Sequence, residues 1–188
     1  MSSLYQNIHQ DLIERCGKND PKAQIKIYNL YFKAMYNSSL RIVKDETEAE
    51  DIMQEAFLSA FKNIGKYKGE VSFGAWLKRI VINRSLDSLK KKKLDIFPLE
   101  DELYKLKEED VNYEVDDAKE QIEIIKNGIN LLPTGYRIIL SLYLLEGYDH
   151  EEIANVMNIT ASTSRSQFLR AKKKLIQILE EEKIKKLL

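Results

Sequence analysis

The sequence predicts an all-α protein built from two small helical domains, and three features carry this prediction. Helix-breaking residues are scarce, with 7 Gly and 3 Pro in 188 residues, and this favours helices over turn-rich β folds. Apolar residues recur at three- and four-residue spacing in several segments, as on the buried faces of amphipathic helices. The acidic stretch 94–120 has few periodic apolar residues and is typical of a linker. We therefore expect domains at residues 1–93 and 121–188.

Three main helices are expected in the N-terminal domain. Their predicted starts are Asp20-Pro21, Asp45 to Thr47, and Ser72, and a short helix around Leu4 to Arg15 is expected before them. Asp and Ser side chains accept hydrogen bonds from free amides at a helix start, and Pro fits the first helical position. The expected inward faces are Met53, Phe57, Ala60, Phe61 and Ile64 on the second helix, and Phe73, Trp76, Leu77, Ile80 and Val81 on the third.

Four helices are expected in the C-terminal domain. The first carries Ile122, Ile125, Ile129 and Leu132 and stops before Pro133. The second, 136–146, is apolar on nearly every side, so we expect it at the buried centre, ended by Gly147 in a left-handed conformation. Asp149 and Thr160 are expected to cap the last two helices. The inward positions of the final helix are Ser164, Phe168, Ala171, Leu175 and Ile178.

Charge is strongly segregated along the chain, although the formal net charge is zero. Residues 78–93 carry seven bases and one acid, and residues 162–175 carry five bases and no acid. Residues 95–120 carry eleven acids and three bases, and residues 45–55 carry six acids and no base. The two basic segments are candidate nucleic-acid surfaces. On charge alone, ordinary solvated helix faces are the better explanation.

Several classes of protein are disfavoured. The single cysteine, Cys16, allows no internal disulfide, which favours a reducing, cytoplasmic location. No signal-peptide pattern is found at the N-terminus, and the longest apolar run, 138–145, is too short for membrane insertion. His9, Cys16 and His150 are too scattered for a metal site. We expect no cofactor, and no nucleophilic set or phosphate-binding glycine loop indicates an enzyme.

The segment from Glu151 to Lys174 has the form of a helix-turn-helix. The small Ala154 allows its two helices to cross closely, and Asn158 lies in the tight connection. The outward side of the second helix displays Thr163, Arg165, Ser166, Leu169, Arg170 and Lys173. Arg and Ser suit contacts to base edges and phosphates in a major groove. We therefore expect this helix to recognise duplex DNA, and a purely structural pair of packed helices is the alternative.

Three segments of the chain together resemble a known family. Residues 149–172 resemble the fourth conserved domain of extracytoplasmic-function (ECF) sigma factors. Residues 48–57 resemble the polymerase-binding segment of that family, and residues 73–83 resemble its promoter-melting helix. The three motifs stand in the family's order and cover nearly the whole chain. The chain is therefore identified as resembling an ECF sigma factor of the sigma-70 family, which directs RNA polymerase to promoters.

The resemblance implies two further sets of functional residues. Those expected to bind core RNA polymerase are Glu48, Asp51, Gln54, Glu55 and Phe57. Those expected to bind melted promoter DNA are Lys66, Tyr67, Phe73, Trp76, Lys78, Arg79 and Asn83. In this second set, cations neutralise phosphates, an aromatic ring stacks on an unpaired base and an amide contacts a base edge. Phe57 and Trp76 are expected to belong to the core as well.

Two positions depart from the family pattern. Ser164 replaces a commonly aliphatic residue, which predicts looser packing of the recognition helix, and Gln167 replaces a commonly basic one. Family members are commonly held inactive by an anti-sigma factor, so the resemblance implies such a partner beside core RNA polymerase and promoter DNA. The rival interpretation is a helix-turn-helix regulator that binds an operator as a dimer, which leaves Trp76 and the Gln54-Glu55 motif unexplained.

Overall fold

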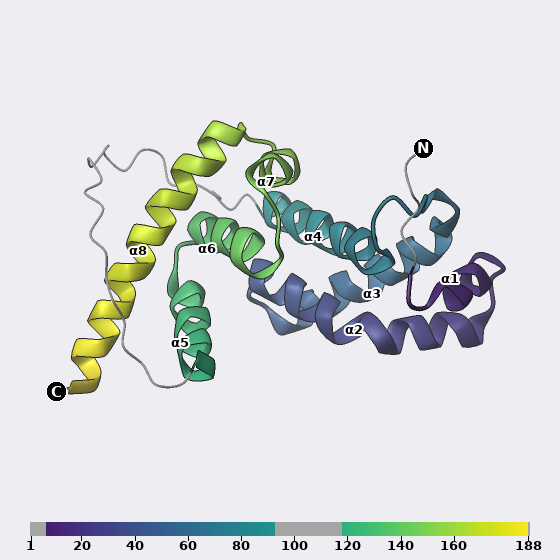
Figure 1. Ribbon diagram of the computed structural model, residues 1–188, viewed down its shortest axis with the longest axis horizontal. Coiled ribbons are helices and arrows are strands. Elements are labelled where there is room, and N and C mark those ends of the chain that lie inside the picture. Colours follow the sequence, from purple (N-terminus) through teal and green to yellow (C-terminus); the bar gives the residue numbers. More distant parts are fainter. Residues whose placement is uncertain (1–6, 93–117, 188) are drawn as a thin grey trace. The chain divides into compact units, whose positions relative to one another are not determined.

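The computed structural model describes residues 7–92 and 118–187, and this part of the chain contains helices and no strand (Figure 1). The all-α fold class is therefore confirmed. The chain divides into two compact units, Met1–Leu94 and Asp95–Leu188. Most of the expected linker, residues 94–117, lies outside the described residues. Its last three residues belong to a helix that begins at Ala118.

Over residues 7–92, unit 1 contains four α-helices and one short 3-10 turn. They are α1 (Gln10–Gly17), α2 (Pro21–Val43), α3 (Glu46–Lys62), η1 (Ile64–Lys66) and α4 (Phe73–Lys91). Helices α2, α3 and α4 pack against one another, and α1 packs on α2. The predicted starts are confirmed, because Asp20, Asp45 and Ser72 each accept a backbone N–H from the first turn of the following helix.

The core of unit 1 forms where the three long helices meet. Phe73, Leu77 and Val81 of α4 are fully buried, as the helical spacing predicts, and they join a cluster that includes Ile27 and Phe57. Phe61, Ile64, Trp76 and Ile80, which were also expected to face inward, are half-buried at its edge. The expected short N-terminal helix is observed as α1, later in the chain than the predicted 4–15 range, whose first residues lie outside the described part.

In its described part, residues 118–187, unit 2 contains four α-helices, one of which ends in a π-helical turn. They are α5 (Ala118–Leu131), α6 (Thr134–Leu140), the π turn η2 (Ser141–Leu145), α7 (His150–Met157) and α8 (Ala161–Leu187). Ile129 and Leu132 pack with Tyr136, Ala171 and Leu175 in one cluster. A Cβ on Gly128 would lie 2.7 Å from Leu175 Cδ1 and 2.8 Å from Leu179 Cδ2. Glycine therefore permits the close approach of α5 and α8.

Two expectations for unit 2 need correction. The second helix is not buried on every side, because Tyr143 and Leu144 are 38% and 49% exposed. They lie in η2, where the wider π geometry changes the direction in which side chains point. On α5, Ile122 and Ile125 are 50% and 39% exposed, so the buried part of its apolar stripe is confined to the C-terminal half. Gly147 ends the segment with φ +77°, the predicted left-handed conformation.

Candidate nucleic-acid and polymerase surfaces

The helix-turn-helix of unit 2 is built by local hydrogen bonds. Asp149 and Glu152 form a reciprocal capping box at the start of α7, with backbone-to-carboxylate distances of 2.8 and 3.0 Å. Asn158 ends α7 with φ +57°, and the Ile159 N–H donates back to the Ala154 carbonyl at 3.0 Å. Thr160 Oγ1 then accepts the Thr163 N–H at 3.0 Å, which starts α8. The predicted caps and turn are thus confirmed.

The outward side of α8 presents most of the expected DNA-binding side chains to solvent. Arg165, Ser166, Leu169 and Lys173 are exposed, while Thr163 and Arg170 are half-buried. Because the inward positions Ser164, Ala171 and Leu175 are buried, the helix is fixed on unit 2 through its opposite side. Its basic side therefore presents exposed cations and short polar side chains to solvent, as expected of a helix that enters a groove.

A polar and aromatic cluster replaces the aliphatic contact expected between the two helices. The Oγ of Ser164, fully buried, lies 2.9 Å from Nδ1 of His150 at the start of α7. The His150 ring stacks on Tyr143 at a centroid distance of 4.9 Å and meets Phe168 edge-on at 5.5 Å. The predicted looser packing of the recognition helix does not follow from Ser164, because His150 satisfies its hydroxyl group. Sequence reasoning did not foresee this pair, since the two residues are 14 positions apart.

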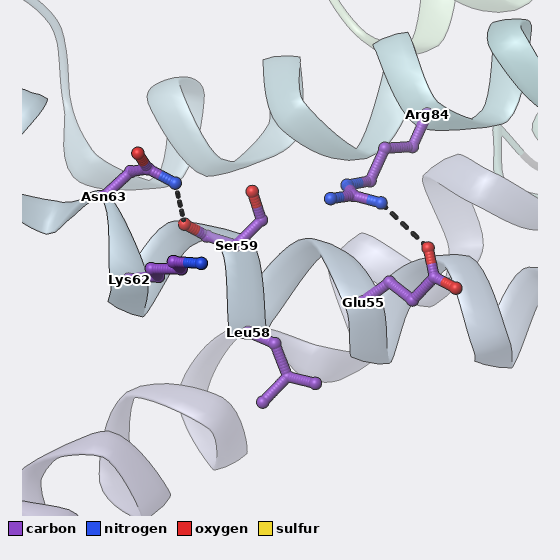
Figure 2. A pocket seen from close by; sticks show the side chains of 6 residues that line it. All are labelled: Glu55, Leu58, Ser59, Lys62, Asn63 and Arg84. Atoms are coloured by element: carbon purple, nitrogen blue, oxygen red, sulfur yellow. Dashed lines mark hydrogen bonds and ion pairs between the residues drawn. The ribbon is translucent and has the colours of Figure 1, made fainter.

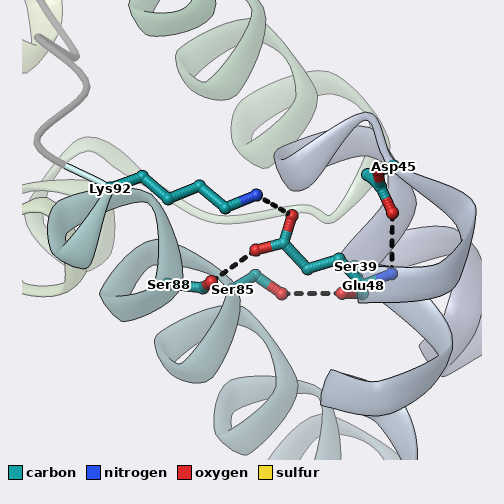
Figure 3. A network of polar contacts seen from close by, with 6 residues as sticks. All are labelled: Ser39, Asp45, Glu48, Ser85, Ser88 and Lys92. Carbon is teal, nitrogen blue, oxygen red and sulfur yellow. Dashed lines mark hydrogen bonds and ion pairs between the residues drawn. The ribbon is translucent and has the colours of Figure 1, made fainter.

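The predicted polymerase-binding residues of α3 differ in their exposure and in their contacts within unit 1. Glu48 accepts hydrogen bonds from Ser88 Oγ and from Lys92 Nζ, the latter at 2.6 Å, and only 15% of its side chain is exposed (Figure 3). Asp51 and Gln54 are exposed. Phe57 is 2% exposed and belongs to the core. In the predicted polymerase-binding set, Asp51 and Gln54 are therefore accessible to a protein partner, whereas Glu48 and Phe57 are largely covered.

Glu55 lies where the acidic helix meets the basic one. Its carboxylate accepts a hydrogen bond from Arg84 of α4 at 2.8 Å (Figure 2). An open pocket beside this pair is lined by Glu55, Leu58, Ser59, Lys62, Asn63 and Arg84. At its far end Asn63 Nδ2 donates to the Ser59 carbonyl at 2.9 Å and so closes the last turn of α3. The Glu55–Arg84 pair thus joins the expected polymerase-binding helix to the expected DNA-binding helix.

The loop before α4 and the first turn of α4 carry the aromatic residues expected to meet melted DNA. Tyr67, Phe73 and Trp76 pack together at centroid distances of 5.4 to 5.6 Å. Phe73 is fully buried, whereas Tyr67 and Trp76 are half-buried, so only these two rings reach the surface. The expected stacking role of Phe73 is therefore not available in this conformation.

The polar residues expected to bind melted promoter DNA lie next to Tyr67 in the chain or along α4. Lys66, Arg79 and Asn83 are exposed, and Lys78 is half-buried. Their arrangement combines flat rings with cations, as single-stranded nucleic acid requires.

Within the described residues, no group of three or more His, Cys, Asp or Glu side chains is placed to hold a metal ion. No helix in that part of the chain is long and apolar enough to cross a membrane.

The all-helical fold and the helix-turn-helix of unit 2 define a class of protein, a helical DNA-binding protein. Residues 27–94 match the family described as Sigma-70 region 2, and residues 122–175 match Sigma-70, region 4. The chain belongs to the ECF group of the sigma-70 family. Sigma factors are generally DNA-recognition proteins without enzymatic activity.

Curated relatives support this membership over nearly the whole length. The chain is 29% identical to the RNA polymerase sigma-H factor of Pseudomonas aeruginosa over 186 residues, 94% of this chain and 96% of that protein. It is 28% identical to the ECF RNA polymerase sigma-E factor of Haemophilus influenzae over 172 residues, 87% and 90% of the two chains. A shorter match to SigW of Bacillus subtilis is 36% identical over 85 residues, 45% of this chain and 46% of that protein.

Solved structures agree with the fold. CnrH, in complex with the cytosolic domain of CnrY, superposes with a TM-score of 0.56 at 18% identity, covering 92% of this chain and 97% of that one. The sigma factor RpoE from Bartonella quintana, in complex with the anti-sigma factor NepR, gives a TM-score of 0.55 at 19% identity, covering 82% and 95%. At these identities the likeness concerns the fold alone.

Proposed function

We propose that this sigma factor works by bipartite promoter recognition. The α8 side chains Arg165 and Arg170 contact the upstream promoter element as duplex, and the loop before α4 captures the downstream element as a single strand. Core RNA polymerase is bound through the exposed middle of α3, around Asp51 and Gln54. The observation that carries this proposal is the exposure of the basic side of α8 while its opposite side is buried in unit 2.

The two halves of this mechanism correspond to two domains. We assign polymerase binding and strand capture to residues 1–93 and duplex recognition to residues 121–188, with 94–120 as the linker between them. The matches to Sigma-70 region 2 and region 4 fall on the two assigned domains. We further propose that the protein acts in the cytoplasm, where RNA polymerase and the chromosome are found, and that it catalyses no reaction.

An anti-sigma factor is the second partner that we propose. CnrH is described in complex with the cytosolic domain of CnrY, and RpoE of Bartonella quintana in complex with the anti-sigma factor NepR. A partner of this kind would act by covering the surfaces that polymerase or DNA needs. Co-purification of the free protein from its host, followed by inhibition of initiation with the captured partner, tests this assignment.

Initiation assays with purified core polymerase test the main proposal. Start sites on a library of promoter fragments should appear only when the protein is added, and they should disappear with the double variant Arg165→Ala plus Arg170→Ala. A Lys22→Ala plus Lys126→Ala variant removes the same charge away from α8 and should keep the wild-type start sites. Tight duplex binding by the protein alone, with no initiation on any fragment, would instead identify an operator-binding regulator.

A further inference from the structure

Asn7 connects the N-terminal segment to the loop that precedes α4. This asparagine lies before α1 and is 9% exposed. Its Oδ1 accepts the Phe73 N–H at 2.8 Å, and its Nδ2 donates to the Tyr67 hydroxyl at 2.8 Å and to Gln10 Oε1 at 3.1 Å. One buried side chain thus holds both ends of the loop formed by residues 67–72.

Tyr67 extends this connection into the middle of the loop. Its hydroxyl accepts from Asn7 and donates to the Val71 carbonyl at 2.6 Å. Its ring packs perpendicular to Phe73 at 5.6 Å and tilted against Trp76 at 5.4 Å. An isolated loop of this length loses conformational freedom when it is ordered, and these contacts offset that cost before any ligand binds.

The loop held in this way carries exposed cations around half-buried rings. Lys66 and Lys68 are exposed on either side of Tyr67, and Trp76 lies one helical turn beyond the loop. A binding site for an unpaired base needs a fixed gap between rings and fixed cations for the flanking phosphates. A loop that is already ordered gains affinity because less freedom remains to be lost on binding.

We propose that Asn7 is a positioning residue for the capture of melted promoter DNA. Through Tyr67 and the Phe73 N–H, it fixes the conformation in which the loop accepts an unpaired base of the downstream element. The inference rests on the function proposed above and adds a residue from the N-terminal segment, outside the matched Sigma-70 regions. Its effect is on base selection by the loop and not on binding of core polymerase.

Two variants break the connection from opposite sides. Asn7→Ala removes the hydrogen bonds to Tyr67, Phe73 and Gln10, whereas Tyr67→Phe keeps the aromatic ring and removes the hydroxyl contacts to Asn7 and Val71. Each is assembled with core polymerase and assayed by transcription from promoters in which the downstream element is randomised. The ratio of transcripts from the preferred base to those from other bases should fall about five- to tenfold in both variants, as expected for losing two hydrogen bonds that fix the loop.

Gln10→Ala is the matched control, because it removes the hydrogen bond between Gln10 and Asn7 and keeps those that Asn7 makes with Tyr67 and Phe73. It should keep the wild-type base preference, and all three variants should bind core polymerase as wild type does. A merely structural role for Asn7 would lower transcription from all templates alike and leave the ratio unchanged, which would overturn the inference. An equal loss of preference in Gln10→Ala would overturn it as well. No initiation by the wild-type protein would refute the proposed function itself.

Discussion

Glu48 and Asp51 lie one helical turn apart on α3, yet they have different surroundings. Glu48 receives hydrogen bonds from Ser88 of α4 and from Lys92 just after it, and its side chain is 15% exposed. Asp51 is exposed. A carboxylate held by two donors at a helix contact contributes to stability, whereas a solvated one contributes little. A carboxylate therefore stabilises the fold at Glu48 and remains accessible to a partner at Asp51.

Replacing these two acids should separate stability from partner binding. Glu48→Ala should lower the free energy of unfolding by about 1–2 kcal/mol, because Ser88 and Lys92 lose their acceptor. Asp51→Ala should leave stability within about 0.5 kcal/mol and weaken core polymerase binding about threefold. Urea unfolding and competition for core polymerase give the two values. Equal destabilisation by both variants would contradict this division.

Asp20 gives stability a dependence on acid pH. A hydrogen bond from Arg15, aided by the amides of Lys22 and Ala23, holds the pKa of this carboxyl below its ordinary value of 3.8. Because the pKa is lower in the folded chain, the contribution is complete above the unfolded value and is lost as pH falls through the folded one. Asp20→Asn keeps a capping acceptor without this titration. Its urea midpoint should therefore fall less than that of wild type between about pH 5 and pH 2, and parallel curves would argue against this assignment.

Helix starts are the part of this fold that local sequence determines most directly. The caps at Asp20, Ser72, Asp149 and Thr160 were all predicted and are all observed. Each depends only on a side-chain oxygen and amides within three residues. The π turn η2 was not predicted, because periodicity does not distinguish it from a regular helical ending.

Contacts between helices were less predictable than the helices themselves. The Glu48–Lys92 ion pair and the Ser164–His150 hydrogen bond join residues that spacing along one helix cannot relate. For the candidate surfaces, sequence patterns predicted which side of α8 is exposed. They did not predict that two predicted polymerase-binding residues of α3, Glu48 and Glu55, accept hydrogen bonds from side chains of α4.

The α7–α8 contact should depend on both Ser164 and His150. Ser164→Val leaves Nδ1 of His150 without its partner in a partly buried site and should cost about 1–3 kcal/mol of stability. Adding His150→Phe should recover part of that loss, since two apolar side chains then face each other. Thermal unfolding and upstream-duplex binding of the single and double variants form a double-mutant cycle. Strictly additive losses would show that the two residues are not coupled.

Over the whole molecule, zero net charge conceals separated acidic and basic surfaces. The acids of α3 and the bases of α8 lie in different units, so each can meet an oppositely charged partner. Phosphate contacts release counterions from DNA, which makes affinity fall as salt rises. The sensitivity to salt should therefore follow the α8 cations and be independent of the protein's net charge.

Promoter binding by the assembled holoenzyme tests this expectation. Arg170→Ala should reduce the slope of log affinity against log salt by about 1, because one phosphate contact is removed. Lys126→Ala on α5, where Lys126 pairs with Glu123, removes the same charge and should leave the slope unchanged. Equal changes in both variants would show that overall charge governs the salt dependence.

The hydrogen bonds of Asn7 also impose an order on events during synthesis. They join residues 60 and 66 positions apart. Asn7 is therefore synthesised long before its partners Tyr67 and Phe73 and cannot form these bonds until both have been made. At bacterial elongation rates the interval is roughly 3–13 s. During that time Asn7 has neither Tyr67 nor Phe73 as a hydrogen-bond partner. The loop before α4 therefore acquires these contacts only after most of the unit has been translated.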